Sequence, residues 1–573
     1  MKFILSQDLL SEPQIAYLSM EIGFRNDIPT YSGGLGVLAG DTIKSAADLN
    51  LPVVAVTLLH RKGYFRQELD ANGSQKEHPE KWSPEEHMTL LPNRVRLSIE
   101  GREVSVQAWV YNISNVVTNW TVPIILLDTD LPENEPEDRS ITDHLYGGDD
   151  RYRLKQEVVL GIGGVMMLRA IGIRIKKYHM NEGHAALLTL ELLQRYKRDI
   201  ESVWDERQVW DVERVKDLCV FTTHTPVEAG HDKFSYDLVK DVTGELIPFD
   251  VLRELAGKDK LNMTLLAMNL SKYINGVAKK HGEVSNMLFP GYKIQAITNG
   301  VHSFTWTCDS FARLYDKYLP GWANEPELFV RIGKVPDEEI WAAHMEAKKK
   351  LIDYVNEITN AGMDYDTFTI GFARRATAYK RASLLFSDTE RLRKIGKGKL
   401  QLIYAGKAHP RDYDGKKNIE EIFKKARELN PDIKIVYLQN YNMELALKMV
   451  SGVDVWLNTP MRPREASGTS GMKAAHNGVI NFSVLDGWWI EGHIEGYTGW
   501  AIGPKPTEAT LVQSTDELDA DDLYQKLEHE VMATFYGNRL VWVRMMQNAI
   551  GKNANYFNSH RMMRRYVTEA YIR

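Results

Sequence analysis

Hydrophobic residues along this chain occur in short uninterrupted runs, separated by stretches in which they recur every three or four positions. Such runs are typical of buried parallel strands, and the spacing of three or four is typical of amphipathic helices. The first half predicts strands at 15–22, 53–60, 123–130, 218–224 and 294–299, with helices at 36–49, 151–171 and 184–197. Residues 95–113 alternate apolar and polar positions around Glu100 and Gly101, which predicts a β-hairpin.

A polar helix predicted at 337–358 separates this series from a more regular one. The second series has predicted strands at 367–375, 400–407, 433–440, 453–460 and 479–487, and predicted helices at 379–395, 415–429, 442–450, 469–477 and over much of 523–573. Strands that alternate with helices of this length build parallel sheets. We therefore expect an α/β protein with two doubly wound, Rossmann-like domains facing a cleft, at 1–340 and 341–555, and a C-terminal helix at 556–573 packed back on the first domain.

The composition restricts the function without locating a site. The 573 residues exceed what one hydrophobic core supports, and 71 basic against 77 acidic side chains give a net charge of -6. This balance argues against nucleic acid or a membrane as a partner. Cys219 and Cys308 lie far apart, so we expect no metal site and no disulfide, which fits a cytoplasmic location. No signal peptide or long apolar run is present in the sequence.

The segment EASGTSGMKAAHNG, residues 465–478, carries the clearest chemistry. Small residues follow a predicted strand, and a predicted helix starts near Thr469. The N–H groups of Thr469, Ser470 and Gly471 would be free there to bind a phosphate. Lys473 follows within about a turn, a placement that suits covalently held pyridoxal phosphate. A surface lysine after a tight turn would give the same pattern.

Two further segments also carry candidate ligand-binding groups. GFARRATAYKRA, residues 371–382, places Arg374, Arg375, Lys380 and Arg381 beyond a strand of the second domain, where doubly wound sheets bind ligands. A solvated basic face is the alternative. YSGGLGVLAGD, residues 31–41, is a glycine-rich turn between a strand and a helix, and it can equally be a purely structural turn.

These segments, in this order, resemble the α-glucan phosphorylases, the family of glycogen, starch and maltodextrin phosphorylases, and in particular its short microbial type. The similarity runs from about residue 15 to beyond 490 and includes YLSMEIG, HMNEGHA, TTHTPVEAG and ITNGVHSFTW. It implies the GT-B glycosyltransferase architecture and pyridoxal 5′-phosphate as cofactor. The implied reaction is reversible, retaining transfer of glucosyl from the non-reducing end of an α-1,4-glucan or maltooligosaccharide to inorganic phosphate, giving glucose 1-phosphate.

The resemblance also implies a role for each matching residue. The catalytic set is Lys473, Arg375, Lys380, His224 and Glu465. The cofactor-binding set is Lys473, Thr469, Ser470, Gly471, Tyr441, Trp306 and Arg374. The substrate-binding set is Gly34, Leu35, Asn299, Glu182, His184, Ala466, Ser467 and Gly468. The chain departs from the family pattern at Arg374, often a lysine, at Thr377, often a histidine, and near Gly23, where an aromatic residue is usual.

Three alternative functions stay open at this point. A nucleotide-sugar-dependent glucan synthase would share the architecture, but it has no use for a cofactor held by lysine. A glycosidase would need paired carboxylates such as Glu182 and Glu465, and a non-catalytic glucan-binding protein would need only the cleft. The sequence leaves glucan length, direction of reaction and oligomeric state open, a homo-oligomer included. Because the short type lacks a regulatory N-terminal segment, allosteric regulation is not expected.

Overall fold

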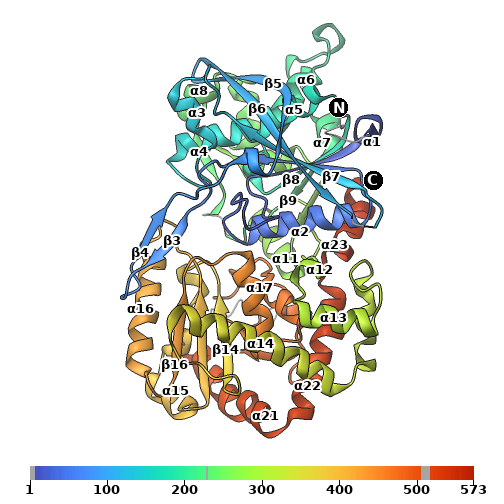
Figure 1. Cartoon of the computed structure of the whole chain (residues 1–573). Helices are drawn as coiled ribbons and strands as arrows, with labels where there is room; N and C mark the ends of the chain where they lie inside the picture. The colour runs from blue at the N-terminus through green and yellow to red at the C-terminus, as the bar shows by residue number, and fades with distance from the viewer. Residues whose placement is uncertain (1–6, 116, 228–229, 505–515, 573) are drawn as a thin grey trace.

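The computed structural model describes residues 7–115, 117–227, 230–504 and 516–572. These residues form two lobes, one above the other in Figure 1, each built on its own sheet. We call the lobe with the nine-stranded sheet the N-lobe and the lobe with the six-stranded sheet the C-lobe. The predicted fold class, α/β with two mainly parallel sheets, is confirmed.

The N-lobe sheet has the order β13-β12-β9-β8-β1-β2-β7-β6-β5 and is parallel except at β6 and β5. Its strands are β1 Gln14–Ser19, β2 Val53–Leu58, β5 Thr89–Ile99, β6 Arg102–Ser114, β7 Thr121–Asp128, β8 Ile175–Asn181, β9 Cys219–Thr222, β12 Tyr273–Gly276 and β13 Gln295–Ala296. Every residue of β1 is buried, because helices cover both faces of the sheet.

The C-lobe sheet has the order β16-β15-β14-β17-β18-β19 and is parallel throughout. Its strands are β14 Phe368–Ala373, β15 Leu400–Ala405, β16 Lys434–Leu438, β17 Val455–Asn458, β18 Ile480–Val484 and β19 Gly499–Ile502. The order reverses between β14 and β17, so loops after these strands diverge and leave room for a ligand. The basic segment follows β14, and the lysine segment follows β17.

Helices pack on both sheets. Those before residue 300 are α1 Gln7–Ser11, α2 Gly34–Asp48, α3 Pro136–Arg139, α4 Asp150–Val158, α5 Gly164–Ile171, α6 Leu188–Arg195, α7 Val212–Leu218, α8 Tyr236–Thr243, α9 Phe249–Ala256, α10 Met263–Asn269 and α11 Lys279–Leu288. Those after it are α12 Ser303–Trp306, α13 Asp309–Tyr318, α14 Asp337–Thr359, α15 Thr389–Gly396, α16 Tyr413–Leu429, α17 Met443–Gly452, α18 Ser470–His476, α19 Trp489–Gly492, α20 Asp516–Lys526, α21 Met532–Gly537, α22 Arg539–Asn548 and α23 Ser559–Tyr566. None of the described helices combines the length and apolar character that a membrane crossing requires.

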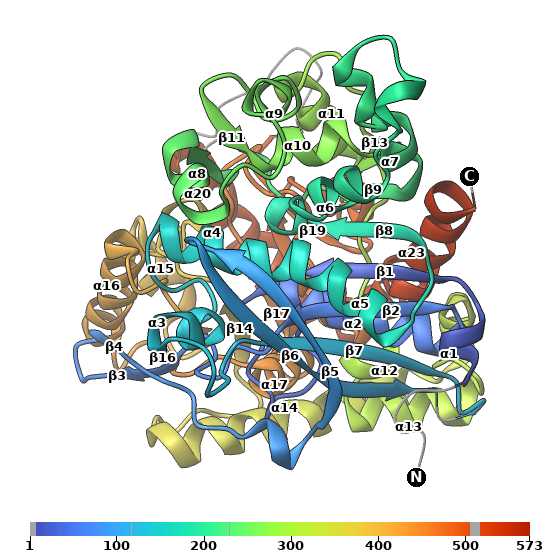
Figure 2. The same cartoon turned by 90° about the horizontal axis from the view of Figure 1, so that it is seen from above.

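The C-terminal segment returns to the N-lobe. Residues Ile15 and Tyr17 of β1 face one core, which also holds Tyr566 of α23 and Tyr571 just beyond it. Figure 2 shows α23 beside β1 and β2. The core of the C-lobe includes Phe311, so residues before 340 pack with the second sheet. The domain boundaries at 340 and 555 stay a prediction.

A two-stranded hairpin links the lobes. It consists of β3 Arg66–Leu69 and β4 Gln75–His78, paired antiparallel, and Figure 1 shows it beside α16. We call residues 66–78 the arm. Gln67 and Gln75 are buried, and their side-chain amides bond to the C-lobe backbone at Gly406, Ala408 and Asn440. The arm therefore joins the N-lobe to the loops that follow β15 and β16.

Most predicted elements are confirmed, and one is wrong. The strands of the second series and the hairpin around Glu100 occur as expected. The helix predicted at 379–395 does not form: 378–380 and 384–386 are single 3₁₀ turns, and only α15 is α-helical. Arg381 has a φ of 48° there, a left-handed conformation that ends a helix. Its guanidinium bonds to the carbonyl oxygens of Thr459 and Pro460, which hold the bend.

Candidate active site

Lys473 is a buried amine near the start of α18, with 7% of its surface exposed. Its Nζ lies 3.9 Å from the ring centroid of Trp306, and the indole N–H donates to the carboxylate of Asp41. Within the described ranges, Nζ makes no hydrogen bond or ion pair. Burial lowers the pKa of Lys473 to about 8, although the charge of Asp41 acts the other way. A buried amine of this kind is a ready nucleophile.

The backbone before Lys473 leaves donors free. Thr469 is the N-cap of α18 and makes no side-chain capping bond, while the N–H groups of Thr469, Ser470 and Gly471 have no acceptor in the described chain. A Cβ on Gly471 would lie 2.2 Å from Oδ1 of Asn481, so only glycine fits there. The three amides and the amine stand close together along one turn, as the sequence predicted.

Glu465 neutralises two cations of the basic segment. Its Oε2 accepts from Arg374 at 2.5 Å and from Lys380 at 2.6 Å, and all three side chains are largely buried. Burial disfavours the charged carboxylate, but the attraction of the two cations outweighs it and lowers the pKa of Glu465 to about 2. The backbone N–H of Glu465 donates to Asp486, whose pKa burial raises to about 7.

Arg375 follows β14 and is exposed to solvent, and it has N-lobe residues among its neighbours. It makes no hydrogen bond or ion pair with any residue that the structure describes. Burial disfavours the charge of Arg375, but the nearby N-lobe side chains of Tyr64, Glu21 and Tyr146 favour the charged form and raise the pKa of Arg375 above its ordinary value. The guanidinium is therefore a cation at the junction of the lobes that is available to an anion.

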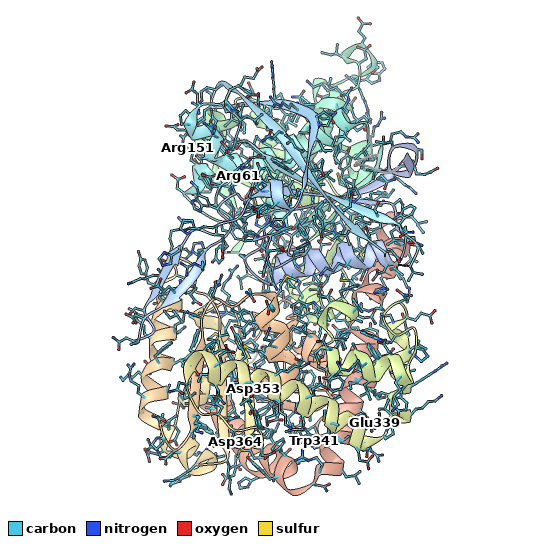
Figure 3. All side chains as sticks on the ribbon, viewed as in Figure 1. Arg61, Arg151, Glu339, Trp341, Asp353 and Asp364 are labelled. Atoms are coloured by element: carbon cyan, nitrogen blue, oxygen red, sulfur yellow. The ribbon has the colours of Figure 1, made fainter. Side chains whose placement is uncertain are left out.

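Two of the charged side chains labelled in Figure 3, Arg61 and Glu339, have ion-pair partners. Arg61 of the N-lobe bonds to Asp128 at 2.7 Å, and Glu339 of α14 bonds to Lys317 at 2.8 Å. Neither pair lies in the candidate site, whereas the guanidinium of Arg375 has no ion-pair partner among the described residues. This difference marks Arg375 as a candidate functional residue.

The glycine-rich turn leads directly into α2, where Gly34 and Leu35 are the first two residues. Their N–H groups have no acceptor among the described residues, which suits an anion at the start of this 15-residue helix. Glu21 holds the turn: its Oε2 accepts from the N–H groups of Ser32 at 2.5 Å and Gly33 at 3.2 Å.

His224 and Glu182 lie at the ends of neighbouring strands of the N-lobe. Glu182 accepts from the N–H of His224 at 2.7 Å and from Oγ1 of Thr225 at 3.0 Å. Nε2 of His224 donates to Oδ1 of Asn181 at 2.6 Å, and burial lowers the pKa of His224 to about 3, so the ring is neutral. Glu182 and Glu465 are both committed to protein donors, which speaks against a glycosidase with these two acids.

The other predicted residues surround these groups. Oδ1 of Asn299 is buried without a partner in the described chain, and His184 lies 3.5 Å from Asp232. Gly468 has a φ of 74° in the loop before α18, where Ala466 and Ser467 also lie. Tyr441 packs in a cluster shared by both lobes, with Val37, Trp306 and Met472.

The three departures from the family pattern, at Gly23, Thr377 and Arg374, have different surroundings. A Cβ on Gly23 would lie 2.9 Å from Cγ of Tyr31, so the ring of Tyr31 fills the space beside that glycine. The buried Oγ1 of Thr377 has no hydrogen-bond partner in the described chain. Arg374 keeps the positive charge of the usual lysine and uses it on Glu465.

One group of side chains away from this region could hold a metal ion by composition. Asp48, His302 and His560 have ligand atoms within 4.8 Å of one another. The N–H of Thr305 donates to Nδ1 of His302, so Nε2 of the neutral ring carries the proton and donates to Asp48 at 2.7 Å. This arrangement joins α2 to α12 and favours a hydrogen-bonded junction over a cation site.

Sequence reasoning missed several groups of the site. Glu21, Asp41 and Asp486 support the turn, the tryptophan and the loop. Glu21 and Asp41 lie inside quoted motifs, and Asp486 follows β18, so their positions were the available signal. Tyr64 and Tyr146 come from segments without any motif, and only the packing of the lobes brings them to Arg375.

Comparisons with known proteins identify the family of the chain. A model of the carbohydrate phosphorylase family matches residues 244–495. A maltodextrin phosphorylase of Thermococcus litoralis is 39% identical over 98% of this chain and 70% of its own length. A glycogen phosphorylase of Aquifex aeolicus is 35% identical over 99% of this chain and 87% of its own. An uncharacterized protein of Methanocaldococcus jannaschii is 32% identical over 97% and 99%.

Two doubly wound lobes that meet around a buried lysine have the GT-B architecture of glycosyltransferases. The chain belongs to the carbohydrate phosphorylase family. The family predicted from the motifs is thereby confirmed, and the enzyme is a phosphorylase rather than a nucleotide-sugar-dependent synthase.

Proposed function

We propose that this phosphorylase acts on α-1,4-glucans, and that it transfers the terminal glucosyl unit to inorganic phosphate with pyridoxal phosphate held on Lys473. The names of the relatives support the substrate class, since they include maltodextrin and glycogen phosphorylases. The observation that carries the cofactor assignment is the buried Nζ of Lys473, which has a pKa of about 8 and no partner in the described residues.

The residues around Lys473 fit the cofactor. The ring of Trp306 provides an aromatic wall 3.9 Å from the amine, and the unpaired N–H groups of Thr469, Ser470 and Gly471 suit its phosphate. When bound, the cofactor supplies its 5′-phosphate as a proton donor and acceptor beside the substrate phosphate. We place Arg374 and Tyr441 near it on the family pattern.

The protein groups divide the remaining tasks. Arg375 binds the substrate phosphate, together with the N–H groups of Gly34 and Leu35 at the start of α2. His224 is neutral, so on the sugar side it supplies a dipole for the developing oxocarbenium ion and adds no positive charge. Glu465 and the loop 466–468 bind glucose hydroxyls, while Lys380 neutralises phosphate.

Retention follows from which side of the sugar these groups occupy. The phosphate that Arg375 holds lies on the face from which the glucan chain departs, and it bonds to the anomeric carbon from that same face. The buried apolar cluster of Val37, Trp306 and Met472 contains residues of both lobes and excludes water from that side of the site. Water is thereby hindered from taking the place of phosphate.

Borohydride reduction tests the proposal. The purified protein should carry one pyridoxal phosphate per chain, and reduction followed by peptide mapping should locate the adduct on Lys473. Lys473→Ala should lose both the cofactor absorbance and the activity while keeping its circular dichroism spectrum. Absence of the cofactor, or an adduct on another lysine, would refute the assignment.

A further inference from the structure

Most cations of the basic segment are already paired with carboxylates. Of the four basic side chains in residues 374–381, Arg374 and Lys380 bond to Glu465, and Arg381 bonds to Asp519 at 2.7 Å. Only Arg375 has no ion pair within the described ranges. Under the proposed function, two phosphates meet beside this one uncommitted guanidinium. Because Lys380 already shares its charge with Glu465, neutral hydrogen-bond donors add to the contacts that hold the substrate phosphate.

Two phenols of the N-lobe lie beside Arg375, and they differ in one respect. The hydroxyl of Tyr146 donates to Oε1 of Glu21 at 2.9 Å. The hydroxyl of Tyr64 is buried and has no hydrogen-bond partner in the chain that the structure describes. A buried hydroxyl without a partner is destabilising, so such an atom marks a place where a ligand group completes the contact.

The position of Tyr64 is fixed on both sides. The N–H of Leu145 donates to the carbonyl of Gly63, and Nζ of Lys407 in the C-lobe donates to the carbonyl of Phe65 at 2.7 Å. These two bonds flank Tyr64 and tie its backbone to both lobes. Its unpaired hydroxyl is therefore not the result of a loose segment.

The surroundings place Tyr64 beside the basic segment, residues 371–382. Its ring centroid lies 6.2 Å from that of His409, in the loop after β15. In the same loop, the backbone carbonyl of Lys407 accepts from the N–H of Ala376, the residue after Arg375. Tyr64 and Arg375 are also close enough that each shifts the pKa of the other. Burial raises the pKa of Tyr64, so the hydroxyl keeps its proton and can donate at neutral pH.

We propose that Tyr64 is a further substrate-binding residue, whose hydroxyl donates a hydrogen bond to the phosphate group that Arg375 binds. The ligand is inorganic phosphate in one direction of the reaction and the phosphate of glucose 1-phosphate in the other. This assignment rests on the proposed role of Arg375. It makes the substrate phosphate a bridge between the lobes, with a cation from the C-lobe and a neutral donor from the N-lobe.

The holoenzyme with Tyr64→Phe tests this, because the variant loses the hydroxyl alone. The dissociation constant of inorganic phosphate, measured by calorimetry, and the KM of glucose 1-phosphate should both rise about tenfold, as for a lost hydrogen bond to a charged group. The KM of a maltooligosaccharide should stay within about twofold of wild type. Tyr292→Phe is the matched control: its hydroxyl donates to Oδ1 of Asn269 at 2.8 Å, neither residue belongs to the candidate site, and its phosphate affinity should not change.

Arg375→Ala separates the two proposals. If Arg375→Ala loses phosphate affinity and Tyr64→Phe does not, the inference about Tyr64 is wrong and the proposed function stands. If both variants bind phosphate like wild type, the role of Arg375 is wrong as well. A Tyr64→Phe enzyme that loses phosphate and maltooligosaccharide affinity to the same extent would show a structural role and would also overturn the inference.

Discussion

Lys473 is a buried amine whose lowered pKa governs how the apoprotein takes up its cofactor. With a pKa of about 8, about one amine in eleven is uncharged at pH 7, against roughly one in three thousand for an ordinary lysine. Since only the neutral amine reacts with an aldehyde, we expect the rate of pyridoxal phosphate uptake to rise with pH and level off above about 8. Stopped-flow absorbance from pH 6 to 10 measures this.

Asp41 provides the control for that pH profile. Its carboxylate raises the pKa of Lys473 against the larger effect of burial. Asp41→Asn should therefore move the inflection to lower pH, while Asp217→Asn, on an exposed pair with Lys272, should leave it in place. A profile that inflects near 10.5 would show that the amine is not buried as described.

Glu465 contributes stability that depends on its charge. Its pKa is about 2 in the folded protein and about 4.5 in the unfolded chain, a difference worth roughly 3 kcal/mol. Because the folded pKa is the lower one, this contribution is fully present above pH 4.5 and is lost as the pH falls toward 2. We expect the wild type to exceed Glu465→Gln in urea-unfolding midpoint at pH 7, with the gap narrowing from pH 5 to 3.

The exposed pair of Glu339 and Lys317 is the matched control for this experiment. Glu339→Gln removes the same charge from the surface, where solvent screens the interaction, so its midpoint should follow the wild type at every pH. A pH-independent gap for Glu465→Gln would show that the carboxylate stabilises the site by shape rather than by charge.

At the scale of elements, the arm is held by buried amides rather than by its surface charges. Gln67 accepts from the N–H of Asn440 at 2.8 Å and donates to the carbonyl of Gly406 at 2.9 Å. Gln67→Leu leaves the N–H of Asn440 without this partner, at about 1–3 kcal/mol, while the carbonyl of Gly406 keeps its bond from the hydroxyl of Tyr437. We expect faster hydrogen exchange at Asn440 and weaker phosphate binding, since the loop after β15 pairs with residues 374–376.

Lys416→Ala tests the same arm without touching the amides. Lys416 pairs with Glu77 at 2.7 Å in a partly exposed position, so its loss should change stability by less than about 1 kcal/mol. Exchange at Asn440 should then match the wild type. If both variants behave alike, the buried amides are not what connects the lobes.

The elements also show how far the sequence could predict the fold. Strands of continuous apolar residues were predicted because both faces of a parallel sheet are buried. The central strand β8 was missed, because it begins Ile-Lys-Lys and its burial comes from β1 and β9. The helix predicted at 379–395 failed because Arg381 bends the chain to reach Thr459, a contact 78 positions away.

The arrangement of the site was predictable where the residues that lie together in space also lie together in the sequence. Lys473 and its three amides lie within one turn, so local pattern sufficed. The pairing of Glu465 with Arg374 and Lys380 joins loops after two different strands, and the charge balance that results could not be read from either segment alone. Tyr64 depends on the approach of the two lobes, which no local signal encodes.

At the scale of the whole molecule, the proposed function places two phosphates, one of them from the cofactor, at the junction of the lobes, and the expected choice of donor follows from that proposal. We expect the enzyme to lengthen a maltooligosaccharide with glucose 1-phosphate, releasing inorganic phosphate, and to run in reverse when phosphate is in excess. UDP-glucose and ADP-glucose should give no product, because the cofactor occupies the volume that a nucleotide needs. Parallel assays with each donor on one acceptor series measure this. Elongation by a nucleotide sugar alone would contradict it.

The return of α23 to the N-lobe has a consequence for the order in which the protein is made. Tyr566 and Tyr571 complete a core that Ile15 and Tyr17 begin, yet the ribosome adds them only after the whole C-lobe. At about 5–20 residues per second, roughly 30–110 s separate the two ends of that core. The first-made sheet must therefore wait, with its apolar face uncovered, for the segment made after the second. This interval is when the nascent chain is most exposed to aggregation and most in need of a chaperone.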